Sequence, residues 1–225
     1  MKKYAVIVAG GLGTRMGSTT PKQYVNLLGK PILWYTINTF LEAFDDLRII
    51  LVVAGNHLET AKEVLCAVDH PERVSITTGG PTRFHSVKNG LNEIRERSIV
   101  FVHDGVRCLL TVNLIRRCYE VALQYGNAVP AIQAVDSIRL ETTEGNKVLN
   151  REQVRLVQTP QTFHSEIIKD AFEQDFDPVF TDEASLVERR GIKINLVEGE
   201  VTNIKITRPI DILIAEKILE ENQFI

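Results

Sequence analysis

Glycines and cations gather in one loop directly behind the first apolar run of the chain. After YAVIVA at residues 4–9, the sequence continues to residue 24 as GGLGTRMGSTTPKQY. Glycines let backbone N–H groups approach a polyphosphate closely, and cations in the same loop add positive charge. The residues concerned are Gly10, Gly11, Gly13, Arg15 and Lys22. The spacing predicts a phosphate-binding loop, and a tight turn with solvated charges is the structural alternative.

Two familiar phosphate-binding motifs do not fit this loop. The dinucleotide fingerprint G-x-G-x-x-G needs glycine where Met16 stands, and it needs an acidic residue after the second strand, where the chain reads Val53-Ala54-Gly55. A Walker A loop needs Ser or Thr after Gly-Lys, but Gly29-Lys30 is followed by Pro31. The sequence therefore excludes both motifs.

The elements that must position this loop alternate between strand and helix. Short apolar runs without polar alternation predict strands buried on both faces, at residues 4–9, 48–53, 74–77, 99–103 and 128–132. Helical spacing follows Pro31 and recurs at residues 59–68, 86–97 and 112–125. The order predicts a three-layer, Rossmann-like α/β fold with a mostly parallel sheet, whose site lies at the carboxyl ends of the strands.

A polar hairpin interrupts this order at residues 136–157. Ile138, Leu140 and Val148 alternate with polar residues around a turn at Gly145. Two strands alone are marginal in water, so the hairpin needs another surface to pack against. We expect a single domain over residues 1–225 in which residues 136–157 form a β-arm used in homodimerisation. Helices at about 164–173, 181–190 and 209–221 and a strand at 193–197 follow.

Composition narrows the class of protein. The 225 residues carry a formal net charge of −3, so binding of nucleic acid by broad charge neutralisation is not expected. The three cysteines form no C-x-x-C pair, which favours a reducing, cytoplasmic location. The apolar run at the start is too short for a signal peptide, and no apolar stretch approaches the roughly 20 residues of a membrane span.

Several stretches resemble one family of enzymes. The order A-G-G-x-G-x-R-M-G and then P-K-Q-Y is similar to the signature of nucleotidyltransferases of the sugar-nucleotide pyrophosphorylase type. Further stretches resemble 2-C-methyl-D-erythritol 4-phosphate cytidylyltransferases, in the family's order from residue 5 to about residue 216. They are GGPTRFHSVKNGL at 79–91, VHDGVR at 102–107, QTPQTF at 158–163, TDEASLVE at 181–188 and NIKITRP at 203–209.

The resemblance implies a transferase of non-mevalonate isoprenoid biosynthesis. The enzyme would join CTP and 2-C-methyl-D-erythritol 4-phosphate to give 4-diphosphocytidyl-2-C-methyl-D-erythritol and pyrophosphate, with Mg²⁺ accompanying CTP. The acceptor phosphate attacks the α-phosphorus, so the site must mainly position two anions and neutralise them. Arg15 and Lys22 match the family's catalytic pair, and Lys205 matches a third cation near the α-phosphate.

The resemblance also implies a set of nucleotide-binding residues. They are Ala9, Gly10, Gly11, Gly13, Gly80, Ser86 and Asp104. Asp104 is in addition the candidate metal ligand, and a turn cap is its structural alternative. Ser86 could instead cap a helix. Pro81 and Cys108 depart from the family pattern, which carries an acidic residue and a proline there, and His103 is interpreted as a structural residue.

The acceptor-binding residues that the resemblance implies are Arg107, Ser137, Arg151 and Thr181, together with Lys205. Ser137 and Arg151 belong to the hairpin and match positions that reach the partner subunit's site. Two other functions remain open. A ribitol-5-phosphate or similar polyol-phosphate cytidylyltransferase shares the loop and the Asp104 motif, and a non-catalytic nucleotide sensor could use the same fold.

Overall fold

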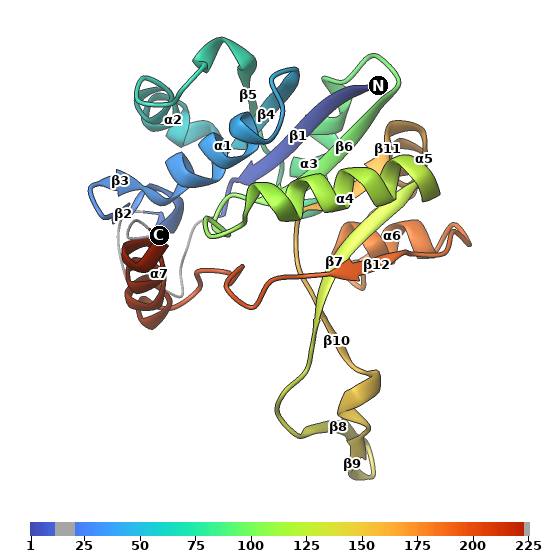
Figure 1. The fold of residues 1–225 in the computed structure, drawn as a ribbon. Helices are drawn as coiled ribbons and strands as arrows, with labels where there is room; N and C mark the ends of the chain where they lie inside the picture. The colour runs from blue at the N-terminus through green and yellow to red at the C-terminus, as the bar shows by residue number, and fades with distance from the viewer. Residues whose placement is uncertain (12–20, 223–225) are drawn as a thin grey trace.

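The computed structural model describes residues 1–11 and 21–222, and its core is one large sheet (Figure 1). The sheet has eight strands in the order β10-β7-β11-β6-β1-β4-β5, and β12 also pairs with β7. Its strands are β1 (Lys2–Ala9), β4 (Leu47–Val53), β5 (Val74–Thr78), β6 (Ser98–Asp104), β7 (Asn127–Gln133), β10 (Arg155–Val157), β11 (Gln161–His164) and β12 (Leu196–Glu198).

The pairing confirms the predicted mostly parallel sheet. Strand β1 lies parallel to both β4 and β6, and β5 lies parallel to β4. Within the described part of this large sheet, the antiparallel pairs are those that β10 and β11 form with their neighbours. All seven residues of β6 are buried, which explains why its sequence shows no polar alternation.

Helices cover both faces of the sheet and complete the three layers. The first face packs against α1 (Ile32–Ala43), α2 (Leu58–Leu65) and α4 (Val112–Tyr125). The second face packs against α3 (Arg83–Asn92), α5 (Ser165–Ala171) and α6 (Glu183–Glu188). Neighbouring residues of β1 alternate between the layers, since Ala5 and Ile7 join the first core and Val6 joins the second.

A third, smaller core includes residues from β2 (Asn26–Leu27), the start of α1, the segment after β6 and α7 (Pro209–Asn222). Helix α7 packs there against the short strand β2, which pairs with β3 (Lys30–Pro31). Cys108 is buried in this core. Short 3-10 turns connect the elements, at η2 (Lys22–Tyr24), η3 (Gly55–His57), η4 (Pro71–Arg73) and η5 (Arg151–Gln153). No helix in the described ranges has the length and apolarity of a membrane span.

The hairpin projects away from the body of the molecule (Figure 1). Strands β8 (Ile138–Thr142) and β9 (Gly145–Leu149) pair only with each other and form a separate two-stranded sheet. The last residues of the expected insertion differ in placement, because Arg155–Val157 form β10 and pair with β7 in the main sheet. The segment that leaves the sheet therefore ends before Arg155.

Some element boundaries differ from the sequence expectation. Helix α3 begins at Arg83 and ends at Asn92, where the spacing predicted residues 86–97. Thr82 explains the earlier start, because its hydroxyl accepts a hydrogen bond from the backbone N–H of His85 and so caps the helix. Strand β11, whose sequence is QTFH, was not predicted at all.

Candidate active site

Two cavities open at the carboxyl ends of the parallel strands, where ligands are expected in such sheets. The larger measures about 620 Å³ and contains the strand ends of β1 and β6 together with the start of α3. The smaller measures about 260 Å³ and lies toward β10, β11 and the segment before α6. Three side chains line both cavities, namely Arg83, Asp104 and Lys205. These three form the wall between the cavities.

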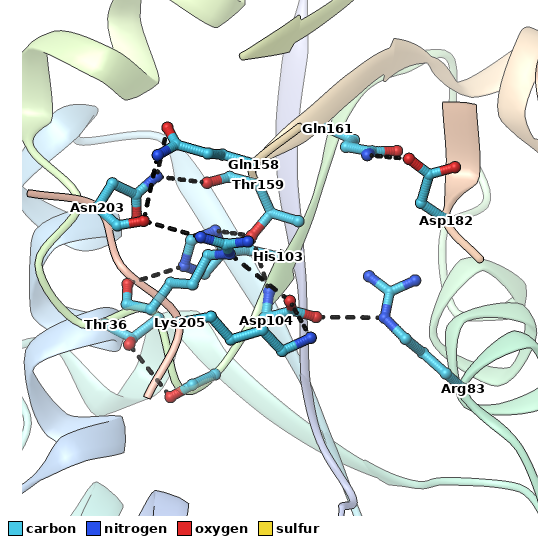
Figure 2. Close-up of polar contacts among 12 residues, drawn as sticks. Thr36, Arg83, His103, Asp104, Gln158, Thr159, Gln161, Asp182, Asn203 and Lys205 are labelled. Carbon is cyan, nitrogen blue, oxygen red and sulfur yellow. Dashed lines mark hydrogen bonds and ion pairs between the residues drawn. The ribbon is translucent and has the colours of Figure 1, made fainter. Parts of the chain in front are cut away.

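Asp104 is the centre of this wall (Figure 2). It ends β6 and is only 7% exposed. One carboxylate oxygen accepts a hydrogen bond from Arg83 Nε at 3.2 Å, and the other lies 2.8 Å from Lys205 Nζ and 3.7 Å from Arg107 Nε. Burial alone would raise the pKa of the Asp104 carboxyl, but the three cations hold that pKa well below its usual range. The carboxylate is therefore ionised and holds cations at the wall.

Arg83 connects Asp104 to a second buried carboxylate. Its guanidinium forms a two-pronged ion pair with Glu183, the first residue of α6, and one of the two contacts is Nη2 to Oε2 at 3.1 Å. Glu183 is 2% exposed, and burial raises the pKa of its carboxyl while Arg83 opposes that shift. Arg83 and Glu183 were not predicted as site residues. In a single sequence, charged residues at helix starts are typical of ordinary surface positions.

His103 is fully buried next to Asp104 and has a partner for each ring nitrogen. Nε2 lies 3.2 Å from the carbonyl oxygen of Arg107, and Nδ1 lies 2.9 Å from the hydroxyl of Thr159. A carbonyl can only accept, so the proton is on Nε2 and Thr159 donates to Nδ1. Burial lowers the pKa of His103 to about 3. The interpretation of His103 as a structural residue agrees with this arrangement.

The described ends of the glycine loop line the larger cavity. Ala9, Gly10, Gly11 and Lys22 all line it. Gln23, which was not predicted, is buried behind the loop, where its side-chain amide donates to the carbonyl oxygens of Ala9 at 2.7 Å and Gly11 at 3.2 Å. Two expected residues, Gly13 and Arg15, lie outside the described residues.

The turn before α3 forms another side of the larger cavity. Gly80, Pro81, Thr82 and Ser86 line it. The Ser86 hydroxyl accepts from the Gly80 N–H at 3.1 Å and donates to the Thr82 carbonyl at 3.0 Å. Because Thr82 is the cap, the alternative that Ser86 caps this helix is wrong. Ser86 instead fixes the shape of the turn that lines the cavity.

The expected acceptor residues separate into two groups. Arg107 and Thr181 line the smaller cavity with Lys205. Ser137 and Arg151 line neither cavity and are exposed at the base of the arm, where Arg151 Nη1 donates to the Val135 carbonyl at 2.9 Å. Cys108 has no chemical role here, since it is buried among apolar side chains and burial raises the pKa of its thiol to about 12.

The three-layer fold, with two cavities that share a wall of cations at the carboxyl ends of the strands, is the arrangement of a nucleotidyltransferase. The family described as 2-C-methyl-D-erythritol 4-phosphate cytidylyltransferase matches residues 4–221. The chain belongs to this family.

Individual relatives agree along nearly the whole chain. The protein of this name from Bacteroides thetaiotaomicron is 44% identical over 220 residues, which cover 97% of this chain and 100% of the relative. That of Bacteroides fragilis is 41% identical over 97% of this chain and 100% of the relative. The crystal structure of the Francisella tularensis enzyme is 31% identical and has a TM-score of 0.80, with 96% of this chain and 99% of that chain covered.

Proposed function

We propose that the protein transfers the cytidylyl group of CTP to 2-C-methyl-D-erythritol 4-phosphate and releases pyrophosphate, as a step of non-mevalonate isoprenoid biosynthesis. Membership of the family and its relatives at about 40% identity support this reaction. The structural observation that supports binding of two substrates side by side is the wall of Arg83, Asp104 and Lys205, which lines both cavities. CTP occupies the larger cavity, and the acceptor phosphate approaches from the smaller one.

Lys205 is the cation that both substrates meet. Its ammonium lines both cavities and is held by Asp104 at 2.8 Å, with 41% of the side chain exposed. When the acceptor phosphate attacks the α-phosphorus, negative charge grows between the cavities, and a fixed cation there stabilises the transition state more than the separate substrates. The attacking phosphate is already ionised near neutral pH, so no protein base needs to remove a proton.

Lys22, on the nucleotide side, is assigned to the charge that develops on the departing pyrophosphate. Arg15, expected beside it, is part of the same proposal on the ground of the sequence motif. Gly80 and Ser86, which line the larger cavity, are assigned to contact with the cytosine ring. Arg107 and Thr181, which line the smaller cavity, are assigned to the acceptor.

Mg²⁺ accompanies CTP in this proposal, but Asp104 does not fit as its main ligand. Both carboxylate oxygens of Asp104 already contact cations. Among the described residues, no group of three or more His, Cys, Asp or Glu side chains could hold a metal ion. We therefore assign the metal to the triphosphate oxygens and water, where it would neutralise phosphate charge, and give Asp104 the role of fixing Lys205 and Arg83.

A homodimer in the cytoplasm is also part of the proposal. The two strands of the arm pair only with each other, and the arm exposes apolar side chains such as Val148, which is 69% exposed. Ser137 and Arg151 lie at its base, away from the cavities of their own chain. Both facts favour an arm that packs on a partner and brings these two residues to the partner's acceptor cavity. The three free cysteines suit a reducing compartment.

The test is pyrophosphate release from CTP and Mg²⁺, with methylerythritol 4-phosphate and ribitol 5-phosphate offered in parallel. We expect a strong preference for methylerythritol 4-phosphate. Preference for ribitol 5-phosphate would make the protein a polyol-phosphate cytidylyltransferase. Release with neither acceptor, together with measurable CTP binding, would instead support a nucleotide sensor.

A further inference from the structure

The segment Gln158-Thr159-Pro160-Gln161 contains a buried side-chain amide that the proposed chemistry leaves without a role. Gln158 follows β10 and is 5% exposed. Its Nε2 donates to the carbonyl oxygen of Glu200 at 2.7 Å, and its Oε1 accepts from the N–H of the same residue at 3.1 Å. The carboxamide thus satisfies both backbone groups of Glu200, as a neighbouring strand would.

The backbone that Gln158 holds leads directly to Lys205 (Figure 2). Asn203 Nδ2 donates to the Thr159 carbonyl at 2.9 Å, and the Asn203 carbonyl accepts from Arg107 Nη1 at 2.8 Å. Two residues later, the Lys205 ammonium contacts Asp104. None of residues 199–205 belongs to a helix or strand. The segment is held by such side-chain contacts together with a few single backbone bonds, one of which joins the Ile206 N–H to the Val106 carbonyl at 3.0 Å.

The packing around Gln158 leaves little freedom to the segment. A Cβ on Gly199 would lie 2.5 Å from Gln158 Oε1 and 3.2 Å from the backbone of Ala131. The Gly199 N–H donates to the Ala131 carbonyl at 3.0 Å, so the start of the segment is fixed to the edge of β7. Gln158 therefore lies directly against this anchor, and it lines the smaller cavity together with Asp104.

We propose that Gln158 is a positioning residue, whose carboxamide fixes residues 199–203 and so holds Lys205 at the wall between the two cavities. A flexible lysine side chain reaches one geometry only if its backbone is held, and a displacement of about 1 Å can cost roughly 100-fold in rate. Gln158 also lines the smaller cavity, but its Nε2 and Oε1 are both bonded to the backbone of Glu200, so we assign its effect on the reaction to Lys205 rather than to a contact with the acceptor. This inference rests on the proposed role of Lys205 in cytidylyl transfer.

The experiment is a double-mutant cycle on kcat with saturating CTP and methylerythritol 4-phosphate. Gln158→Ala, Lys205→Ala and the double variant are compared with the unaltered protein. We expect Gln158→Ala to lower kcat by about 10-fold or more with a smaller change in KM for CTP. In the Lys205→Ala background, the same substitution should cost less than about 2-fold, because residues that act through one group are not additive. Losses that multiply would overturn the inference.

Gln174→Ala is the matched control. Like that of Gln158, its side-chain amide bonds to the backbone, here by donating to the carbonyls of Ala171 at 2.9 Å and Leu186 at 3.0 Å, but Gln174 lines neither cavity. We expect a comparable loss of thermal stability with kcat unchanged. An equal fall of kcat in Gln174→Ala would show a general effect of destabilisation and would contradict the positioning role.

Two further outcomes keep the test decisive. If Gln158→Ala does not fold, Gln158→Glu replaces it, since it keeps the size but places an acceptor against the Glu200 carbonyl, and the same non-additivity with Lys205→Ala is expected. If Lys205→Ala alone keeps full activity, the proposed role of Lys205 fails and the inference falls with it. If Lys205→Ala lowers kcat and this loss multiplies with that of Gln158→Ala, the role of Gln158 is wrong, but the proposed role of Lys205 stands.

Discussion

At the scale of single residues, a neutral histidine lies next to Asp104 and the cations that contact it. His103 is buried behind Asp104, with its Nε2 proton directed to the Arg107 carbonyl and its Nδ1 facing Thr159. Thr159 also accepts the backbone N–H of Asp104 at 3.2 Å. Protonation of His103 would break the bond from Thr159 and add a buried positive charge near Arg107 and Arg83. The residue supports the wall only while it is neutral.

We predict that His103→Gln weakens the pH dependence of stability. The native pKa is about 3 and the unfolded value is near 6.5, so below pH 6.5 the unfolded chain takes up a proton that the native protein does not. Stability is therefore lost as pH falls, by about 2 kcal/mol between pH 8 and pH 5 from this group. Urea unfolding at both pH values should show a smaller difference for His103→Gln. An unchanged difference would contradict the assignment.

The residue types at the site were only partly predictable. Asp104 could be found because it directly follows a buried strand, at the sheet edge where ligands bind. Arg83 and Glu183 lie 100 residues apart in the sequence, and the ion pair between them exists only because α3 and α6 cover the same face of the sheet. Spacing along one chain carries no signal for such a pair.

At the scale of elements, the turn before α3 shapes one side of the larger cavity, where CTP is proposed to bind. Thr82 caps the helix, and Ser86 closes the turn through Gly80 and Thr82. A Cβ on Gly80 would lie 2.4 Å from the Cβ of His85 and 3.2 Å from its carbonyl carbon. The close approach of this turn to the helix therefore requires glycine.

We predict that Gly80→Ala raises KM for CTP by about 10-fold or more, because the turn must move away from α3 and reshape the cavity wall. Initial-rate kinetics over a range of CTP concentrations would measure the change. Gly55→Ala is the control, since a Cβ there would make an ordinary 3.6 Å contact with Thr78. We expect its KM to stay at the original value, and a normal KM in Gly80→Ala would refute the role of the turn.

Sequence patterns predicted the long elements and some of the short ones, such as α5 and α6, but missed others. The central runs of β1, β4 and β6, at residues 5–9, 49–53 and 99–102, are wholly apolar, so their strand character is evident before any tertiary contact forms. Strand β11 has the sequence QTFH, whose Gln161 and Thr162 are polar yet buried. Its strand conformation comes from pairing with β6 and β7 on both sides. That pairing is a long-range property that no local pattern reveals.

At the scale of the whole molecule, the proposed dimer makes a complete site from two chains. The body supplies both cavities, and the arm carries Ser137 and Arg151 away from them. A substitution in the arm of one chain would then impair the partner's site, whereas a substitution in the body would impair the chain's own site. This separation distinguishes an exchanged arm from an arm that serves its own chain.

We predict that Lys22→Ala and Arg151→Ala, each nearly inactive alone, regain activity when they are unfolded and refolded together. Random pairing makes half of the dimers mixed, and one site in each mixed dimer is complete, so about a quarter of the original activity is expected. Lys22→Ala mixed with Lys205→Ala is the control, since both residues belong to the body and no complete site can form. If the first mixture stays as inactive as the control, the arm does not serve the partner.

Because the wall of Arg83, Asp104 and Lys205 separates two neighbouring cavities, one synthetic compound could occupy both. A compound that joins a cytidine-like group to a polyol-phosphate-like group would fill cavities of about 620 Å³ and 260 Å³ on the two sides of the wall. Once one half is bound, a short linker presents the other half at an effective concentration in the mM range. Such a bisubstrate inhibitor would bind tightly because only three side chains separate the two cavities. Each natural substrate occupies only one of them.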